Sequence, residues 1–280
     1  MIFQHLSKSV GQRILMDREI LKALAKDPKY IPGIYNYCDR WCERCALSSR
    51  CLNRALVEEH FGDLQESDAL NEAFWQRLSE MLNHTLSLLR ETAKERGIDL
   101  DRMDHDRNGQ SENMIKESAV GHLISHASEG YARAVEEWFQ ANEYLFYRKE
   151  EELNQIRLVS ARNDPASEAI GINDAIEVIR WYQYQIAVKL MRAIGSAAGE
   201  KDSELRDFPK DSDGSAKVAL ISIERSISAW TILLSSFPEQ KKQIVGFMAS
   251  LENIKNRVET QFPQARAFMR PGFDEMPDGG

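Results

Sequence analysis

Four cysteines, the only ones in the chain, lie within one short segment near the start of the sequence: Cys38, Cys42, Cys45 and Cys51. Their spacing is C-x3-C-x2-C-x5-C. A thiolate is a soft ligand, and four of them on a short, turning stretch of backbone suit a zinc ion or an iron–sulfur cluster. The sequence therefore predicts a four-cysteine metal site.

The spacing also bears on which metal is bound. Structural zinc sites commonly use two close pairs of ligands separated by a longer spacer, which this chain lacks. A compact run of four cysteines is closer to ferredoxin-like cluster binding, although the ferredoxin spacings differ. The stretch from Cys42 to Cys51 resembles part of the auxiliary-cluster tracts of some radical SAM enzymes, which implies a [4Fe–4S] cluster. No βα alternation typical of the barrel of those enzymes follows it. We therefore favour a [4Fe–4S] cluster over Zn²⁺ as the cofactor.

Charge and composition narrow the class of protein. The formal net charge is −8 at pH 7, whereas nucleic-acid-binding proteins normally carry a basic footprint, so we expect no nucleic-acid partner. The first residues lack the basic region and apolar run of a signal peptide, and no long uncharged apolar stretch predicts a membrane span. We expect a cytoplasmic protein, without membrane contact, whose thiols stay reduced.

Apolar residues recur at helical spacing over 7–26, 113–161, 167–196 and 215–236. Further helices are predicted over 52–61, over 68–96 between the candidate caps Ser67 and Gly97, and over 237–261. The pattern over 113–161 fits one kinked helix or two, and the β-branched residues of 215–236 leave a strand as the alternative. Ser236-Phe-Pro-Glu239 has the form of a capping box that opens the last helix. These elements predict an all-α fold, with an N-terminal helix and four-cysteine module at 1–62, an up-and-down helical bundle at 66–262 and a flexible tail at 263–280.

Two weaker patterns also involve metal-ligand residue types. His122, His126 and Glu129 share one face of a helix, because residues three and four apart stack on each other, and they form a second candidate metal site. That face lies opposite the apolar stripe, which favours a solvated surface instead. Residues 104–109 match the start of an EF-hand calcium loop, but Ile115 stands where that loop needs a glutamate.

Polar residues lie near or interrupt the apolar stripes of two later segments, namely Glu177, Arg180 and Gln183 in one and Glu224 and Arg225 in the other. We interpret them as helix-edge ion pairs, with buried partners or a pocket lining as the alternative. No Gly-x-Ser-x-Gly, Walker A or Gly-x-Gly-x-x-Gly motif is present, so the sequence leaves open whether the protein is an enzyme.

Two functions agree with these patterns. In the first, the metal site staples a helical bundle whose apolar groove binds another protein. In the alternative, the protein is an iron–sulfur redox protein or enzyme that exchanges electrons with a partner or with a second site in the bundle.

Overall fold

The structure is a computed structural model, and it describes residues 23–61, 79, 86–87, 90–91, 93–95, 97, 122–159, 165–200 and 210–274 of the 280-residue chain. The chain divides into two compact units, neither of which is continuous in sequence. Unit 1 comprises Met1–Asn36, Arg40–Arg107 and Pro271–Phe273, and unit 2 comprises Tyr37–Asp39, Asn108–Arg270 and Asp274–Gly280.

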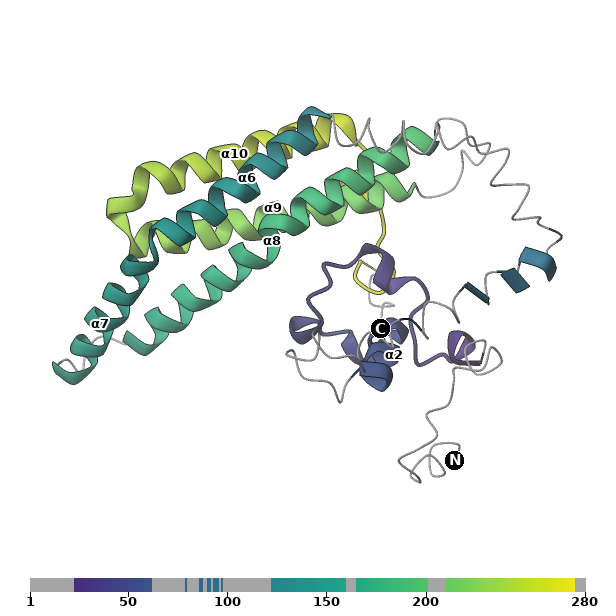
Figure 1. The fold of residues 1–280 in the computed structure, drawn as a ribbon, viewed down its shortest axis with the longest axis horizontal. Coiled ribbons are helices and arrows are strands. Elements are labelled where there is room, and N and C mark those ends of the chain that lie inside the picture. The colour runs from purple at the N-terminus through teal and green to yellow at the C-terminus, as the bar shows by residue number, and fades with distance from the viewer. Residues whose placement is uncertain are drawn as a thin grey trace, which may run out of the picture. The chain divides into compact units, whose positions relative to one another are not determined.

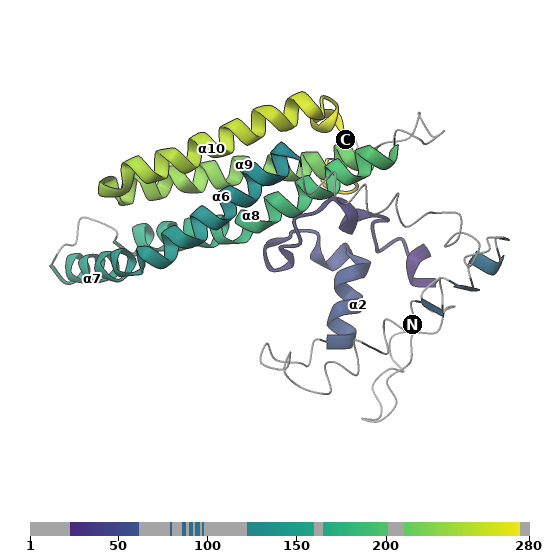
Figure 2. The ribbon, with the colours of Figure 1, turned by 45° about the horizontal axis from the view of Figure 1, so that its top comes forward.

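Unit 2 is a helical bundle. Its described α-helices are α6 (Leu123–Ala141), α7 (Glu143–Val159), α8 (Pro165–Glu200), α9 (Asp211–Ser236) and α10 (Lys241–Gln261). α6 packs on α8, α8 on α9, α9 on α10 and α10 on α6, which closes a four-helix arrangement (Figure 1). Successive long helices run in alternating directions, and α7 continues beyond α6 beside the first turns of α8 (Figure 2).

The described residues contain helices and turns but no strand, which confirms the all-α prediction and rules out a strand at 215–236. Within the described residues 122–159, the segment predicted as one kinked helix or two forms two helices, which meet at Asn142. The backbone N–H of Asn142 still donates to the Trp138 carbonyl, while its side-chain amide donates to the same oxygen at 2.8 Å. Asn142 thus caps the end of α6, because its amide competes for helical backbone groups.

The interface between α8 and α9 is the most extensive in unit 2. Many residues on the buried face of α9 have small side chains, which allows neighbouring helices to approach closely. These residues are Gly214, Ser215, Ala216, Ala219, Ser222 and Ser226. The buried Ser222 hydroxyl donates to the Val218 carbonyl one turn earlier at 2.9 Å, so it does not need a partner on another helix. Long apolar side chains such as Ile179 and Leu190 fill the α8 side of the core.

Aromatic side chains fill the centre of the bundle. Trp138 and Trp230 meet edge-to-face with ring centroids 5.2 Å apart, and Trp230 stacks on Phe247 at 4.9 Å. The indole N–H of the fully buried Trp230 donates to the hydroxyl of Tyr131 at 2.9 Å. The hydrogen bond matters because a buried indole donor without a partner would destabilise the fold.

The predicted capping box at Ser236 is wrong. Ser236 is the last residue of α9, and a single 3-10 turn, η6 (Pro238–Gln240), precedes α10 without any side-chain cap. The physical reason is burial of the Phe237 side chain, whose ring lies edge-on to that of Phe146 with the ring centroids 5.2 Å apart. Anchoring this ring makes Phe237 the C-cap of α9, so the chain turns one residue later than the cap pattern predicts.

The prediction of a flexible tail from residue 263 is wrong as far as residue 274. Phe262, Ala265 and Phe268 are buried, and the short turn η7 (Ala265–Ala267) packs on α9. Asp274 pairs with Arg270 at 2.9 Å and with Lys217 of α9 at 2.8 Å. The apolar residues recur at every third position, which suits a tight turn lying on a helix. Residues 275–280 fall outside the described part of the chain.

α9 is the one described helix with the length and apolar composition of a membrane span, at a mean hydropathy of 1.4. Half of that window is buried inside the fold. The core helix of a water-exposed bundle has the same composition, so this is weak evidence for a membrane location.

The described part of unit 1 contains short turns, one ten-residue helix and shorter helical stretches. The turns η3 (Cys42–Arg44) and η4 (Ser48–Arg50) precede α2 (Leu52–Phe61), which confirms the helix predicted over 52–61. η2 (Ile34–Tyr37) carries the buried Ile34 and ends in the first residue that belongs to unit 2. The described residues of 7–26 and of 68–96 are helical. Residues 62–78 lie outside the described ranges, so the boundary predicted at 62–66 stays a prediction.

Candidate functional site

The cysteine segment is a succession of single turns. Cys42 begins η3, and Cys45 and Cys51 are the C-cap residues of η3 and η4. The N–H of Cys45 donates to the Cys42 carbonyl at 3.3 Å, and the N–H of Cys51 donates to the Ser48 carbonyl at 3.2 Å. Each of these two cysteines therefore stands where a turn ends and the backbone becomes extended. This local structure accounts for the short gaps of two and five residues between Cys42, Cys45 and Cys51.

All four cysteines are half-buried, and none forms a disulfide. Across the residues that the structure describes, no three His, Cys, Asp or Glu side chains gather into a group that could hold a metal ion. The cysteine thiols would therefore have to move toward one another to bind a metal. The four-cysteine metal site stays a prediction at this point.

Basic side chains accompany the cysteines within unit 1. The guanidinium of Arg44 stacks over the Trp41 ring, 4.1 Å from its centroid. Arg54 lies 3.9 Å from both Glu43 and Glu58. Arg40 is exposed and has a left-handed backbone with φ of 61°, the only such non-glycine residue among those described. A left-handed conformation is unfavourable for a residue with a Cβ, so the chain makes a forced turn just before Trp41.

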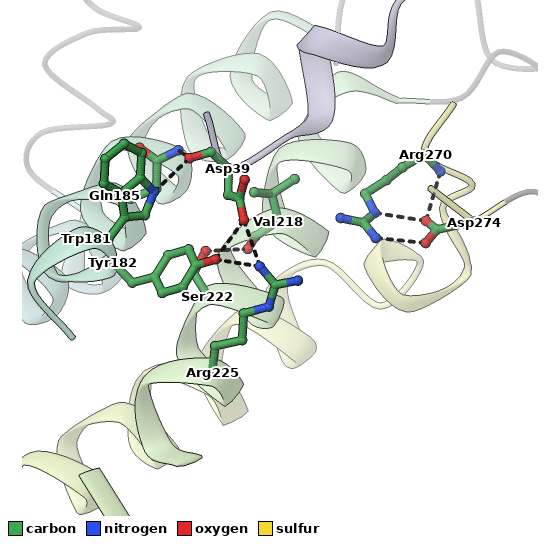
Figure 3. Close-up of polar contacts among 9 residues, drawn as sticks. All are labelled: Asp39, Trp181, Tyr182, Gln185, Val218, Ser222, Arg225, Arg270 and Asp274. Carbon is green, nitrogen blue, oxygen red and sulfur yellow. Dashed lines mark hydrogen bonds and ion pairs between the residues drawn. The ribbon is translucent and has the colours of Figure 1, made fainter. Parts of the chain in front are cut away.

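The residue that follows Cys38 is held by the helices of unit 2 (Figure 3). We call this set the Asp39 cluster; it consists of Asp39, Trp181, Tyr182, Gln185 and Arg225. The indole N–H of Trp181 donates to the backbone carbonyl of Asp39 at 3.0 Å, and the Gln185 amide donates to the same oxygen at 3.2 Å. The Tyr182 hydroxyl and the Arg225 guanidinium both donate to one carboxylate oxygen of Asp39, each at 2.7 Å.

Burial governs the electrostatics of this cluster. Tyr182 is 1% exposed, and burial, with a further contribution from the Asp39 carboxylate, raises the pKa of its hydroxyl to about 12. Burial alone would lower the pKa of Arg225, but its hydrogen bond to Tyr182 and the nearby Asp39 charge raise that pKa above the ordinary value. The cluster is therefore an ion pair with a neutral phenol at neutral pH.

The residue that precedes Cys38 is also held by unit 2. The Tyr37 ring lies edge-on to Phe268, with centroids 4.6 Å apart. It also packs so closely on Gly214 that a Cβ added there would overlap the ring and approach Phe268 to 2.7 Å. Burial would raise the pKa of Asp211, but hydrogen bonds from Arg192, Ser196 and Tyr37 lower it below its ordinary value. Both sequence neighbours of Cys38 thus have fixed partners in the bundle.

Sequence reasoning missed most of the Asp39 cluster. The exposed side chains of Arg225 and Glu224 both form ion pairs, as the helix-edge interpretation predicts: Arg225 pairs with Asp39, and Glu224 pairs with Arg266. Gln183 is buried, and its amide donates to Glu136 at 2.9 Å. The arginine beside the apolar stripe was the one available signal, although a half-exposed guanidinium does not by itself identify its acidic partner.

The residues of the second candidate metal site have separate roles, one as a helix cap and the others on or near the surface of α6. His122 precedes α6, and its Nδ1 accepts a 3.2 Å hydrogen bond from the Ile124 N–H as the N-cap. His126 is exposed on the first turn of α6, and Glu129 is half-buried. These three residues form no metal-binding group in the structure. The possible calcium loop at 104–115 lies outside the described ranges.

A cavity of about 520 Å³ opens between α7 and the first turns of α8. Its floor is apolar and contains the buried Leu153, Ile172 and Phe237. Glu143, Glu150, Asn154 and Asn173 add polar groups to its wall. The exposed Tyr147 and Ile170 also line it, so the cavity continues into an apolar surface that an interaction partner could cover.

Comparison of the chain with protein-family models, with curated proteins and with solved structures found no match. A functional proposal therefore has to rest on the residues and contacts described above.

Proposed function

We propose that this chain is a cytoplasmic metal-binding protein in which Cys38, Cys42, Cys45 and Cys51 hold a [4Fe–4S] cluster, with Zn²⁺ as the competing cofactor. One observation carries the proposal. Every cysteine of the chain lies within one segment of single turns, half-buried and without a disulfide. Half-burial suits a cluster, because it limits access of water to the sulfurs while leaving the thiols open to an incoming metal.

In this proposal the metal staples the cysteine segment, and unit 2 binds another protein. A segment made of short turns buries little apolar surface, and metal ligation is one way to hold such a segment in a single conformation. The cavity between α7 and α8 supports the binding role, because its apolar floor opens onto the exposed Tyr147 and Ile170. The acidic net charge supports a protein partner over a nucleic acid.

The alternative is an iron–sulfur redox protein or enzyme. It is supported by the aromatic residues around Cys38, since Tyr37 precedes it and the Trp181 indole donates to the carbonyl of the following residue. Polar and aromatic groups near a cluster set its solvent access and its reduction potential. In this alternative the cluster exchanges electrons with a partner or with a second site in the bundle.

The deciding experiment is anaerobic purification of the full chain, followed by a visible spectrum and by iron, sulfide and zinc analysis. Broad absorption near ~400 nm with about four irons and four sulfides per chain supports the cluster. One zinc per chain and a colourless protein supports the stapled module. A Cys42→Ser, Cys51→Ser double variant is the control, and equal metal content in that variant and the wild type would refute the four-cysteine site.

A further inference from the structure

We infer that the cavity between α7 and α8 is a docking groove for an amphipathic helix of a partner protein, with basic side chains beside the apolar face of that helix. The inference rests on the part of the proposed function in which unit 2 binds another protein, and it does not depend on the metal site. It goes further by naming the secondary structure and the charge of the partner. All the residues that line the cavity belong to unit 2.

The shape of the cavity follows from the two helices that enclose it, which run beside each other (Figure 2). On α7 the lining residues recur at every third or fourth position from Glu143 to Asn154, and on α8 they do so from Pro165 to Ile176. Residues at this spacing share one face of a helix. At about 1.5 Å per residue, each stripe is roughly 16 Å long, or about three helical turns. A third helix of similar length fits the space between two such stripes.

The floor of the groove is apolar and held in place by the bundle core. The ring of Phe146 lies edge-on to that of the buried Phe237, with centroids 5.2 Å apart, and stacks on the buried Phe139 at 5.7 Å. Leu153 and Ile172 add buried aliphatic surface from the two helices. A floor that is fixed by ring packing needs little ordering when a partner binds, which favours association.

Apolar side chains continue from the floor onto both edges of the groove. Tyr147 on α7 is 61% exposed, and Ile170 on α8 is 69% exposed. A helix seated on the floor would cover both side chains, and its own apolar residues at three- and four-residue spacing would meet them.

The charged groups of the groove determine which helix fits it. Lys149 is already paired, because its ammonium lies 3.0 Å from Glu168 and 3.4 Å from Glu152. Glu143 and Glu150 also line the groove, and neither forms an ion pair with another described residue. They stand seven residues apart on one face of α7, so lysines or arginines at the same separation on a partner helix can meet both carboxylates.

The test uses the full chain and a synthetic helical peptide as the probe. The peptide has about 14 residues, enough for the three turns of the groove, with leucines along one face and two lysines seven positions apart to match Glu143 and Glu150. Its twin has glutamates in place of the lysines. Fluorescence anisotropy at low salt measures the affinity of each labelled peptide. We expect the lysine peptide to bind, and the glutamate peptide to bind at least about tenfold more weakly because like charges then face each other.

Variants of exposed residues locate the binding surface without disturbing the core. Glu143→Gln and Glu150→Gln should each weaken the lysine peptide about two- to fivefold, as expected for an exposed ion pair. Ile170→Ser should weaken it about tenfold, because the contact with a large apolar side chain is lost. Glu151→Gln is the matched control, since Glu151 is exposed on α7 but does not line the groove. It should bind like the wild type.

Two results would overturn the inference alone. One is equal affinity of the two peptides, and the other is a lysine peptide that binds all four variants as it binds the wild type, which would place the binding surface of unit 2 elsewhere. If neither peptide binds the wild type, the inference fails and the binding role proposed for the cavity loses its support as well. A chain that contains no metal and still binds the lysine peptide through the groove would refute the four-cysteine site and leave the inference intact.

Discussion

Tyr182 donates a 2.7 Å hydrogen bond to the carboxylate of Asp39, a residue 143 positions earlier in the chain. Arg225 reaches the same carboxylate oxygen from a different helix, 186 positions away from it. A phenol that is almost fully buried is thus hydrogen-bonded to groups from two distant segments. Residues 37–39 are therefore part of the bundle's polar network, because Asp39 supplies the acceptor that Tyr182 and Arg225 share.

The close contact between Gly214 and Tyr37 predicts that a larger residue at position 214 destabilises the protein. Gly214→Ala would place a methyl group against the Tyr37 ring and Phe268, and such overpacking costs about 1–3 kcal/mol. The same change at Gly246, where α10 has nothing within 4 Å, should stabilise the protein by about 1 kcal/mol through helix propensity. Denaturant unfolding of both variants checks the prediction, and two changes of the same sign would contradict it.

Removing the acceptor of the hydrogen bond from Trp230 to Tyr131 should destabilise the core without creating a cavity. Tyr131→Phe removes the acceptor and leaves the buried indole N–H without its partner, which should lower the free energy of unfolding by about 1–3 kcal/mol. Tyr144→Phe on the exposed face of α7 is the control and should change little. Thermal unfolding measures both, and an unchanged midpoint in Tyr131→Phe would show that the bond does not stabilise the fold.

The ion pairs of Asp274 predict a dependence of stability on pH. Burial would raise the pKa of this carboxyl, but Arg270 and Lys217 lower it far below the ordinary value. Ionised Asp274 therefore stabilises the fold above the unfolded-state pKa of about 3.9, and this contribution is lost as pH falls through the lower folded-state pKa.

We expect Asp274→Asn to lower the free energy of unfolding by about 2 kcal/mol at neutral pH. The difference from wild type should shrink progressively in the acid range below about pH 4. Urea unfolding at a series of pH values measures the difference. Glu151→Gln, at an exposed position of α7, is the control. A difference that is constant with pH would show that charge is not the source of the stabilisation.

Loss of a single ligand should affect the two units differently. Under the proposed function, Cys42→Ser should lower metal content and increase amide hydrogen exchange in residues 1–60, because the proposed metal would no longer hold the turns. The helical signal of residues 113–261 should largely persist, since the bundle core does not include Cys42. Ser49→Ala in the same segment is the control. Complete loss of the helical circular-dichroism signal in Cys42→Ser would contradict this prediction.

The helices of the bundle were predictable where apolar residues kept a long 3.6-residue period, as on α8, whose buried Ile172, Ile179 and Ile186 are seven residues apart. The C-terminal turn was not, because Pro263, Pro271 and Gly272 suggest an irregular tail, while the burial of Phe268 depends on a complementary surface on α9. The local sequence around Phe268 does not show which surface a distant helix presents to it.

One part of the candidate site could be predicted from local sequence and the other could not. Cysteine spacing indicates ligands without reference to the fold. The Asp39 cluster depends on pairs of residues separated by more than 140 positions, and no local pattern specifies which acid meets Arg225. The arginine beside the apolar stripe of 215–236 indicated an ion pair, but it did not indicate which acid would form it.

The discontinuity of unit 2 sets an order of events during synthesis. Asp39 leaves the ribosome long before Arg225 is translated; at roughly 5–20 residues per second the interval is about 10–40 s. For most of that time residues 37–39 exist while α9 has not yet been made. The Asp39 carboxylate therefore gains its Arg225 partner only when much of α9 is complete.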